Sequence, residues 1–243
     1  MNADALKKIA QQMVAPGKGI LAADESTGTI EKRFTKINLP STEDNRRAYR
    51  EMLFTTPGLS DHISGVILYD ETIRQHASTG VPLVKIIQNA EVLPGIKVDQ
   101  GTKEMEGSPK EKLTKGLDGL PDRLKEYAAM GAKFAKWRAV ITIEGNTLPT
   151  DANLRQNAKD LAVYARACQK ANIVPMVEPE VLMDGSHGMD RCREVSERTL
   201  TALFEELKNA GVLIEGTILK TNMVISGKES GEKKTAEEVA EAT

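Results

Sequence analysis

A chain of 243 residues can bury a sizeable hydrophobic core, as one large α/β domain or as two smaller ones. Its net charge is −2 and 28% of its residues are charged, so neither nucleic acid nor a membrane surface is indicated as a partner. Two cysteines are too few for a disulfide framework. No apolar run is long enough to span a bilayer, and the polar N-terminus lacks a signal-peptide core. The sequence therefore predicts a cytoplasmic protein.

Short apolar runs alternate with longer amphipathic segments along the chain. The apolar runs predict six buried strands, at residues 19–23, 64–69, 95–99, 134–143, 173–178 and 214–223. The amphipathic segments predict helices at residues 42–53, 120–130, 151–171 and 190–210, and a last one within 234–243. We expect Asp151 and Thr235 to be N-caps, residues 101–115 to be mobile and His187 to lie in a surface turn.

Alternation of strands and helices indicates a parallel sheet covered by helices, closed as a barrel or open and doubly wound. Charged residues gather at or just after the C-terminal ends of the strands, where barrel active sites are built. They are Asp24, Lys97, Lys136, Arg138, Glu178, Glu180 and Lys220. No Gly-x-Gly-x-x-Gly turn or P-loop follows any strand, so nucleotide binding on an open sheet is disfavoured. The sequence favours a TIM (β/α)8 barrel.

Only six strand–helix units are found, where a complete barrel has eight. We therefore expect residues 1–243 to form a single barrel domain that is incomplete at its C-terminus. An isolated six-stranded remnant would leave two strand edges unpaired.

Converging lysines and carboxylates can perform carbon–carbon chemistry without a metal. Like charges and burial both favour the neutral form of a lysine, and a neutral lysine attacks ketones and aldehydes. The iminium that results withdraws electrons, and nearby carboxylates can move protons. The three histidines have no metal-ligand spacing, so we expect neither a metal nor a cofactor. The alternative from the residues alone is a set of merely solvated strand ends.

Five local sequences resemble the signature motifs of class I, Schiff-base-forming fructose-bisphosphate aldolases, in that family's order and spacing. They are Ala15–Gly28 (APGKGILAADESTG), Leu93–Asp99 (LPGIKVD), Phe134–Arg138 (FAKWR), Val174–Glu180 (VPMVEPE) and Glu215–Lys220 (EGTILK). The resemblance extends from about residue 10 to the last residue. It implies reversible cleavage of fructose 1,6-bisphosphate to dihydroxyacetone phosphate and glyceraldehyde 3-phosphate, a glycolytic lyase reaction.

The resemblance also implies roles for individual residues. Lys220 matches the lysine that forms the imine with the C2 carbonyl, and Glu178 matches the general acid/base of that step. Asp24 matches the carboxylate near the C4 hydroxyl, and Lys136 matches the lysine that lies between the two acids and keeps them ionised. The remaining matches line the substrate pocket near the C6 phosphate: Lys97, Arg138, Arg33 and Thr29, the last in place of the more usual serine, with Glu180 expected to pair with a lysine.

Further expectations follow from the family. The last two strands of its barrel supply a serine–glycine loop and an arginine that bind the C1 phosphate, and none of these residues is present here. The chain as given is therefore expected to be inactive or nearly so, whereas a longer protein would be an aldolase. A homo-oligomer, a tetramer by resemblance, and a phosphorylated sugar as the only small-molecule partner are also implied. The alternatives are another Schiff-base barrel aldolase or transaldolase, and a catalytically silent binding scaffold.

Overall fold

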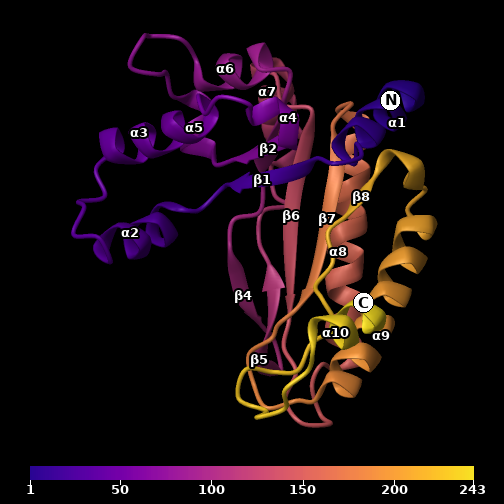
Figure 1. Cartoon of the computed structure of the whole chain (residues 1–243). Coiled ribbons are helices and arrows are strands. Elements are labelled where there is room, and N and C mark those ends of the chain that lie inside the picture. The colour runs from indigo at the N-terminus through magenta and orange to yellow at the C-terminus, as the bar shows by residue number, and fades with distance from the viewer.

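One six-stranded parallel sheet forms the centre of the computed structural model, which describes all residues from Met1 to Thr243 (Figure 1). Its order is β1-β2-β3-β6-β7-β8, so each strand lies beside its predecessor in this sheet. A doubly wound sheet would reverse this order at a switch point. The strands are β1 (Gly19–Ala23), β2 (Ile63–Leu68), β3 (Leu93–Lys97), β6 (Phe134–Ile141), β7 (Val174–Val181) and β8 (Ile218–Leu219). Successive parallel pairing in one direction is the arrangement of consecutive barrel units, in agreement with the prediction.

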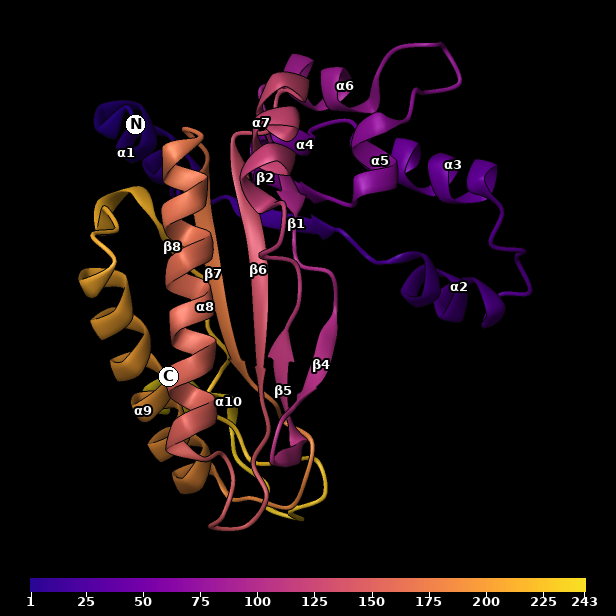
Figure 2. The same cartoon turned by 180° about the vertical axis from the view of Figure 1, so that it is seen from behind.

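Helices cover the outside of this sheet. Figures 1 and 2 both show α8 and α9 side by side along β6 and β7, while α2 and α3 project from the end of β1. The helices are α1 (Ala3–Met13), α2 (Thr27–Thr35), α3 (Glu43–Phe54), α4 (Leu59–His62), α5 (Asp70–Arg74), α6 (Leu83–Asn89), α7 (Leu120–Met130), α8 (Asp151–Lys170), α9 (Met189–Asn209) and α10 (Ala236–Ala242), with a 3-10 turn at Ile214–Gly216. None of them is both long and apolar enough to cross a membrane.

Every predicted strand and helix is present with its ends shifted by at most three residues, except the sixth strand. Helices α2, α4, α5 and α6 and the strands of residues 102–114 were not predicted. The segment 214–223 was expected to be one strand, but only Ile218 and Leu219 pair with β7. The segment begins as a 3-10 turn and has a neighbour on one side only, so the ladder ends after two residue pairs. One further backbone bond, from Lys220 N to Val177 O at 2.9 Å, holds the lysine that follows β8.

The capping predictions differ between the two helices concerned. Thr235 caps α10 in a capping box with Glu238, as predicted. Asp151 is not the N-cap of α8. Thr150 holds that position because its hydroxyl accepts the Asn153 N–H at 3.1 Å, and Asp151 is the first helical residue.

The segment 101–115 is ordered, contrary to the expectation of mobility. It forms an antiparallel hairpin of β4 (Thr102–Met105) and β5 (Ser108–Thr114). Buried polar side chains attach this hairpin to the barrel. The Glu111 carboxylate accepts hydrogen bonds from the amide and the hydroxyl of Thr150, each at 2.8 Å, and the Thr114 hydroxyl donates to Arg138 O at 2.7 Å. The polar composition that suggested mobility therefore supplies the contacts that fix the hairpin.

The N-terminal side of the sheet is filled by side chains. Leu6, Ala10 and Met13 of α1 pack against Ile67, Phe134, Val174 and Met176 in one buried cluster. The Phe134 ring lies so close to Gly95 that a Cβ there would be 2.3 Å from it. Glycine in β3 therefore makes room for the aromatic ring of Phe134, which fills the sheet interior near its N-terminal side.

Candidate active site

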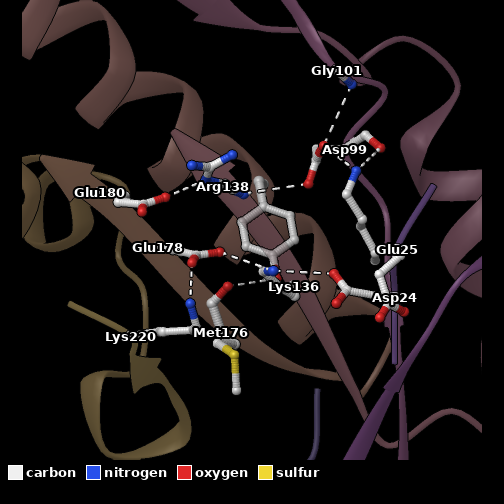
Figure 3. A network of polar contacts seen from close by, with 12 residues as sticks. Asp24, Glu25, Asp99, Gly101, Lys136, Arg138, Met176, Glu178, Glu180 and Lys220 are labelled. Atoms are coloured by element: carbon white, nitrogen blue, oxygen red, sulfur yellow. Dashed lines mark hydrogen bonds and ion pairs between the residues drawn. The ribbon is translucent and has the colours of Figure 1, made fainter. Parts of the chain in front are cut away.

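Lys136 lies between two carboxylates contributed by separate strands (Figure 3). Its Nζ is 3.1 Å from Asp24 Oδ2, at the end of β1, and 3.2 Å from Glu178 Oε2, on β7. All three residues are at least nine-tenths buried. Lys136 therefore lies between the two acids, which is the position that the resemblance implied for it.

The pKa of Lys136 is raised above its usual value. Burial by itself lowers it, but the charges of Asp24 and Glu178 and the hydrogen bonds to them outweigh burial. The general argument that clustered lysines depress one another's pKa therefore does not apply to this lysine. Lys136 is a permanent cation here, which suits it to hold carboxylates and not to act as a nucleophile.

Lys220 contacts the other oxygen of the same carboxylate. Its Nζ donates to Glu178 Oε1, so the two oxygens of Glu178 each face a different lysine (Figure 3). The Lys220 side chain is 44% exposed, whereas Lys136 is 10% exposed. A carboxylate held by a fixed cation on one side and an accessible amine on the other can exchange a proton with that amine.

A cavity of about 1040 Å³ opens beside this centre. It is lined mainly by polar residues, which is the environment expected for a charged ligand. Every predicted site residue except Lys220 lines it: Asp24, Thr29, Arg33, Lys97, Lys136, Arg138, Glu178 and Glu180. Lys220 instead borders an apolar groove of about 400 Å³ between β1 and β8, together with Ile20, Ile67, Met176 and Ile218. Lys220 therefore borders this groove while contacting Glu178, which lines the cavity.

Each predicted phosphate-binding cation is paired with a carboxylate in this structure. Lys97 Nζ contacts Asp99 Oδ1, and also Asp99 O at 3.1 Å. Arg33 pairs with Glu25. These pairs hold the cationic groups at the wall of the cavity.

Glu180 pairs with Arg138 and not with a lysine, so that expectation was wrong. The pair forms because β6 and β7 run side by side and direct alternate residues to the same face, and because Lys136 is already occupied by two carboxylates. Burial would lower the pKa of Arg138, but the hydrogen bond to Glu180 raises it. Arg138 is therefore a permanently charged group.

Two acids of the site were not among the predicted site residues. Asp99 holds Lys97, and its Oδ2 also accepts the Arg138 N–H at 3.4 Å. Glu25 is the neighbour of Asp24 and binds Arg33. The period-two alternation of Lys97-Val98-Asp99 was a usable signal for the first, whereas no sequence signal identifies the partner of Glu25.

His187 is buried and does not lie in an exposed turn. Only 8% of it is exposed, and neither ring nitrogen has a hydrogen-bond partner. His187 lies just before α9. The chain around Gly227 packs on it, and Gly227 N donates a hydrogen bond to His187 O at 2.8 Å. The Asp-Gly-Ser-His-Gly composition suggested a turn but did not show this covering segment.

Comparison with known proteins identifies the family. A family model described as fructose-bisphosphate aldolase class-I, glycolytic, matches residues 5–243. The chain is 56% identical over all its 243 residues to a probable fructose-bisphosphate aldolase class 1 of Xanthomonas campestris pv. campestris, of which it covers 72%. It is 53% identical over 241 residues to the cytoplasmic isozyme of fructose-bisphosphate aldolase from Spinacia oleracea, covering 67% of that protein and 99% of this chain.

A solved structure gives the same result. Fructose-bisphosphate aldolase from Plasmodium falciparum, in a ternary complex with TRAP and a small-molecule inhibitor, superposes with a TM-score of 0.98 at 48% identity. The match covers 99% of this chain and 70% of that one, and it confirms the barrel-type fold. This chain belongs to the class I fructose-bisphosphate aldolase family.

Proposed function

We propose that this chain carries the residues that catalyse the reversible cleavage of fructose 1,6-bisphosphate through an imine on Lys220. The observation that carries the proposal is the Glu178 carboxylate, which faces Lys220 with one oxygen and the buried cation Lys136 with the other. A proton acceptor beside an accessible amine is what imine formation requires. Asp24, on the far side of Lys136, provides the second carboxylate that the bond cleavage requires.

The first half of the proposed reaction forms the iminium. The neutral amine of Lys220 attacks the C2 carbonyl, and Glu178 takes up and returns the protons that turn the carbinolamine into iminium and water. Lys136 holds the Glu178 carboxylate in place beside Lys220, because it binds the other carboxylate oxygen.

The second half breaks the C3–C4 bond. Its electron pair moves to the iminium nitrogen and leaves an enamine on Lys220, while the C4 hydroxyl gives its proton to Asp24 and becomes the aldehyde of glyceraldehyde 3-phosphate. Protonation of the enamine at C3 and hydrolysis of the imine release dihydroxyacetone phosphate. The reverse sequence forms the bond, so the same residues serve condensation.

The cations along the cavity wall are proposed to bind the C6 phosphate. Lys97, Arg138 and Arg33 all line the cavity, as does Thr29, whose hydroxyl lies 3.1 Å from that of Ser26. A phosphate can compete for these cations because it offers more negative charge than the single carboxylate each now contacts.

Location is inferred from the relatives, and assembly from the resemblance to the family. Proteins from Spinacia oleracea and Arabidopsis thaliana are described as cytoplasmic or cytosolic, and we infer the same compartment for this chain. We also infer that residues 1–243 act as one domain and that the chain assembles as a homo-oligomer.

Substrate choice tests the proposed function against the other Schiff-base enzymes. The purified chain is incubated with excess EDTA and fructose 1,6-bisphosphate, with fructose 6-phosphate plus erythrose 4-phosphate, or with deoxyribose 5-phosphate. Triose phosphate formed only from fructose 1,6-bisphosphate, at however low a rate, is the expected result. Product from either of the other mixtures alone would assign the chain to a transaldolase or deoxyribose-phosphate aldolase instead. A Lys220→Arg variant serves as the inactive control, because a guanidinium stays protonated.

A further inference from the structure

Arg50 is a fully buried arginine directly behind the catalytic centre. It lies on α3, with none of its side chain exposed, although arginine is almost never buried without a specific partner. Its contacts are to the chain around Asp24. Nε donates to Ala23 O at 3.3 Å and Nη2 donates to Glu25 O at 2.8 Å. The guanidinium therefore holds the two backbone carbonyls that flank Asp24.

The side chain of Glu25 completes this clamp. The Glu25 Oε2 atom is 3.5 Å from Arg50 Nη2. The Glu25 Oε1 atom binds Arg33, one of the cations proposed to bind the C6 phosphate. Nη1 of Arg50 has no hydrogen-bond partner. Burial lowers the pKa of Arg50, and the nearby charge of Glu25 opposes this. A cation buried at such cost, with one nitrogen unpartnered, is poorly explained by packing alone.

The consequence for Asp24 follows from where the strand ends. Ala23 is the last residue of β1, so Asp24 stands in irregular chain with no ladder to fix it. Its carboxylate must nevertheless remain within 3.1 Å of Lys136. The bonds from Arg50 to residues 23 and 25 replace the missing ladder.

We propose that Arg50 is a positioning residue that fixes the Asp24 carboxylate for carbon–carbon bond cleavage, and that it takes no part in imine formation. The inference rests on the proposed function and adds a residue that acts through Asp24 without touching substrate. The imine-forming groups belong to β6, β7 and the residue after β8, so they do not depend on α3 for their position.

A single-turnover trap separates these two steps. The protein is mixed with fructose 1,6-bisphosphate, quenched with borohydride at successive times, and the mass of the adduct on Lys220 is measured. A hexose bisphosphate adduct reports an imine whose C3–C4 bond is intact, and a triose phosphate adduct reports cleavage. In Arg50→Met we expect the total adduct to form as in the wild type, while the hexose-to-triose conversion rate falls on the order of 10²-fold, as for a misplaced catalytic group.

Two further variants make the result decisive. Arg50→Lys can retain one of the two carbonyl bonds, so its conversion rate should lie between those of the wild type and Arg50→Met. If Arg50→Met does not fold, the ratio of the hexose-to-triose conversion rates of Arg50→Lys and the wild type tests the proposal instead. Arg47→Met, on the same helix but in a pair with Glu51 away from Asp24, should convert as the wild type does.

Each remaining outcome contradicts the inference. Unchanged conversion in a folded Arg50 variant would show that Asp24 is fixed without the arginine. Equal loss of both adducts in folded Arg50→Lys would show general support of the barrel instead of a role in cleavage. No adduct in the wild type would instead refute the proposed function, and this inference would fall with it.

Discussion

Replacing Lys136 by methionine should destabilise the protein strongly at neutral pH. At an effective dielectric of about 20, a charge pair at 3.1 or 3.2 Å has a Coulomb attraction of about 5 kcal/mol. The desolvation of three buried charges offsets much of this, and removing one partner from a buried pair costs about 3–5 kcal/mol. Glu178 keeps Lys220 as a partner, so we expect a loss near the lower limit, about 3 kcal/mol.

The loss in Lys136→Met should also depend on pH. Without the lysine cation, Asp24 is left as a buried carboxylate with no cationic partner, and a carboxylate in that environment binds a proton more readily in the folded state than in the unfolded one. Stability relative to the wild type therefore recovers as pH falls, because protonation removes the uncompensated charge. Urea denaturation at pH 7.5 and pH 5, followed by the fluorescence of the single, fully buried Trp137, measures both effects.

A surface lysine provides the control for this experiment. Lys125 is 74% exposed and its Nζ is 3.0 Å from Asp122 Oδ1, so Lys125→Met should cost less than about 1 kcal/mol at either pH. A deficit below about 1 kcal/mol in Lys136→Met, or one that is the same at both pH values, would refute the reasoning.

Three other predictions concern groups that support the site. Burial lowers the pKa of His187, so its contribution to stability is fully present above about pH 6.5 and is lost as pH falls through the folded pKa. His187→Gln should abolish this part of the pH dependence of the free energy of unfolding, measured with urea. Identical pH profiles for the variant and the wild type would contradict this prediction. The Tyr164 hydroxyl donates to two buried backbone carbonyls, at 2.6 and 3.2 Å, so Tyr164→Phe should lower the free energy of unfolding by about 1–3 kcal/mol, and a neutral effect would show that these carbonyls have other partners. Gly95→Ala should destabilise the protein by about 1–3 kcal/mol or more, because the added Cβ would meet the Phe134 ring. Gly28→Ala should not destabilise it, because Gly28 lies in a helix and its added Cβ would meet open space. Equal thermal midpoints for the two variants would contradict the packing argument.

The sequence was informative where one physical rule decides the outcome. Apolar runs identified the strands because buried parallel strands are apolar on both faces, as in β2. The run Gly19–Ala23 coincides with β1, but only Ala23 of this predicted buried strand is buried, because β1 lies at the edge of the sheet. The helix Leu120–Met130 was predicted with both ends correct. The convergence of Asp24, Lys136 and Glu178 was expected because the carboxyl ends of parallel strands meet.

Partner choice within the site was much less accessible from the sequence. Glu180 pairs with Arg138 because strand register and the prior occupation of Lys136 decide it, and neither is visible in a sequence. The expectation that residues 101–115 are mobile was based on their many charged residues. The sequence does not show that one of these, Glu111, is buried, with only 1% of it exposed. Arg50 showed no signal at all, because its role depends on the distance between α3 and the end of β1.

The most direct test of the account is to locate the covalent adduct. The chain is incubated with dihydroxyacetone phosphate and excess EDTA, reduced with borohydride and mapped by peptide mass spectrometry. We predict one triose phosphate adduct per chain, on Lys220, lost in Lys220→Arg and formed more slowly in Glu178→Gln. An adduct on Lys136 or Lys97 instead, or none on a folded chain, would contradict the assignment of Lys220 as the nucleophile.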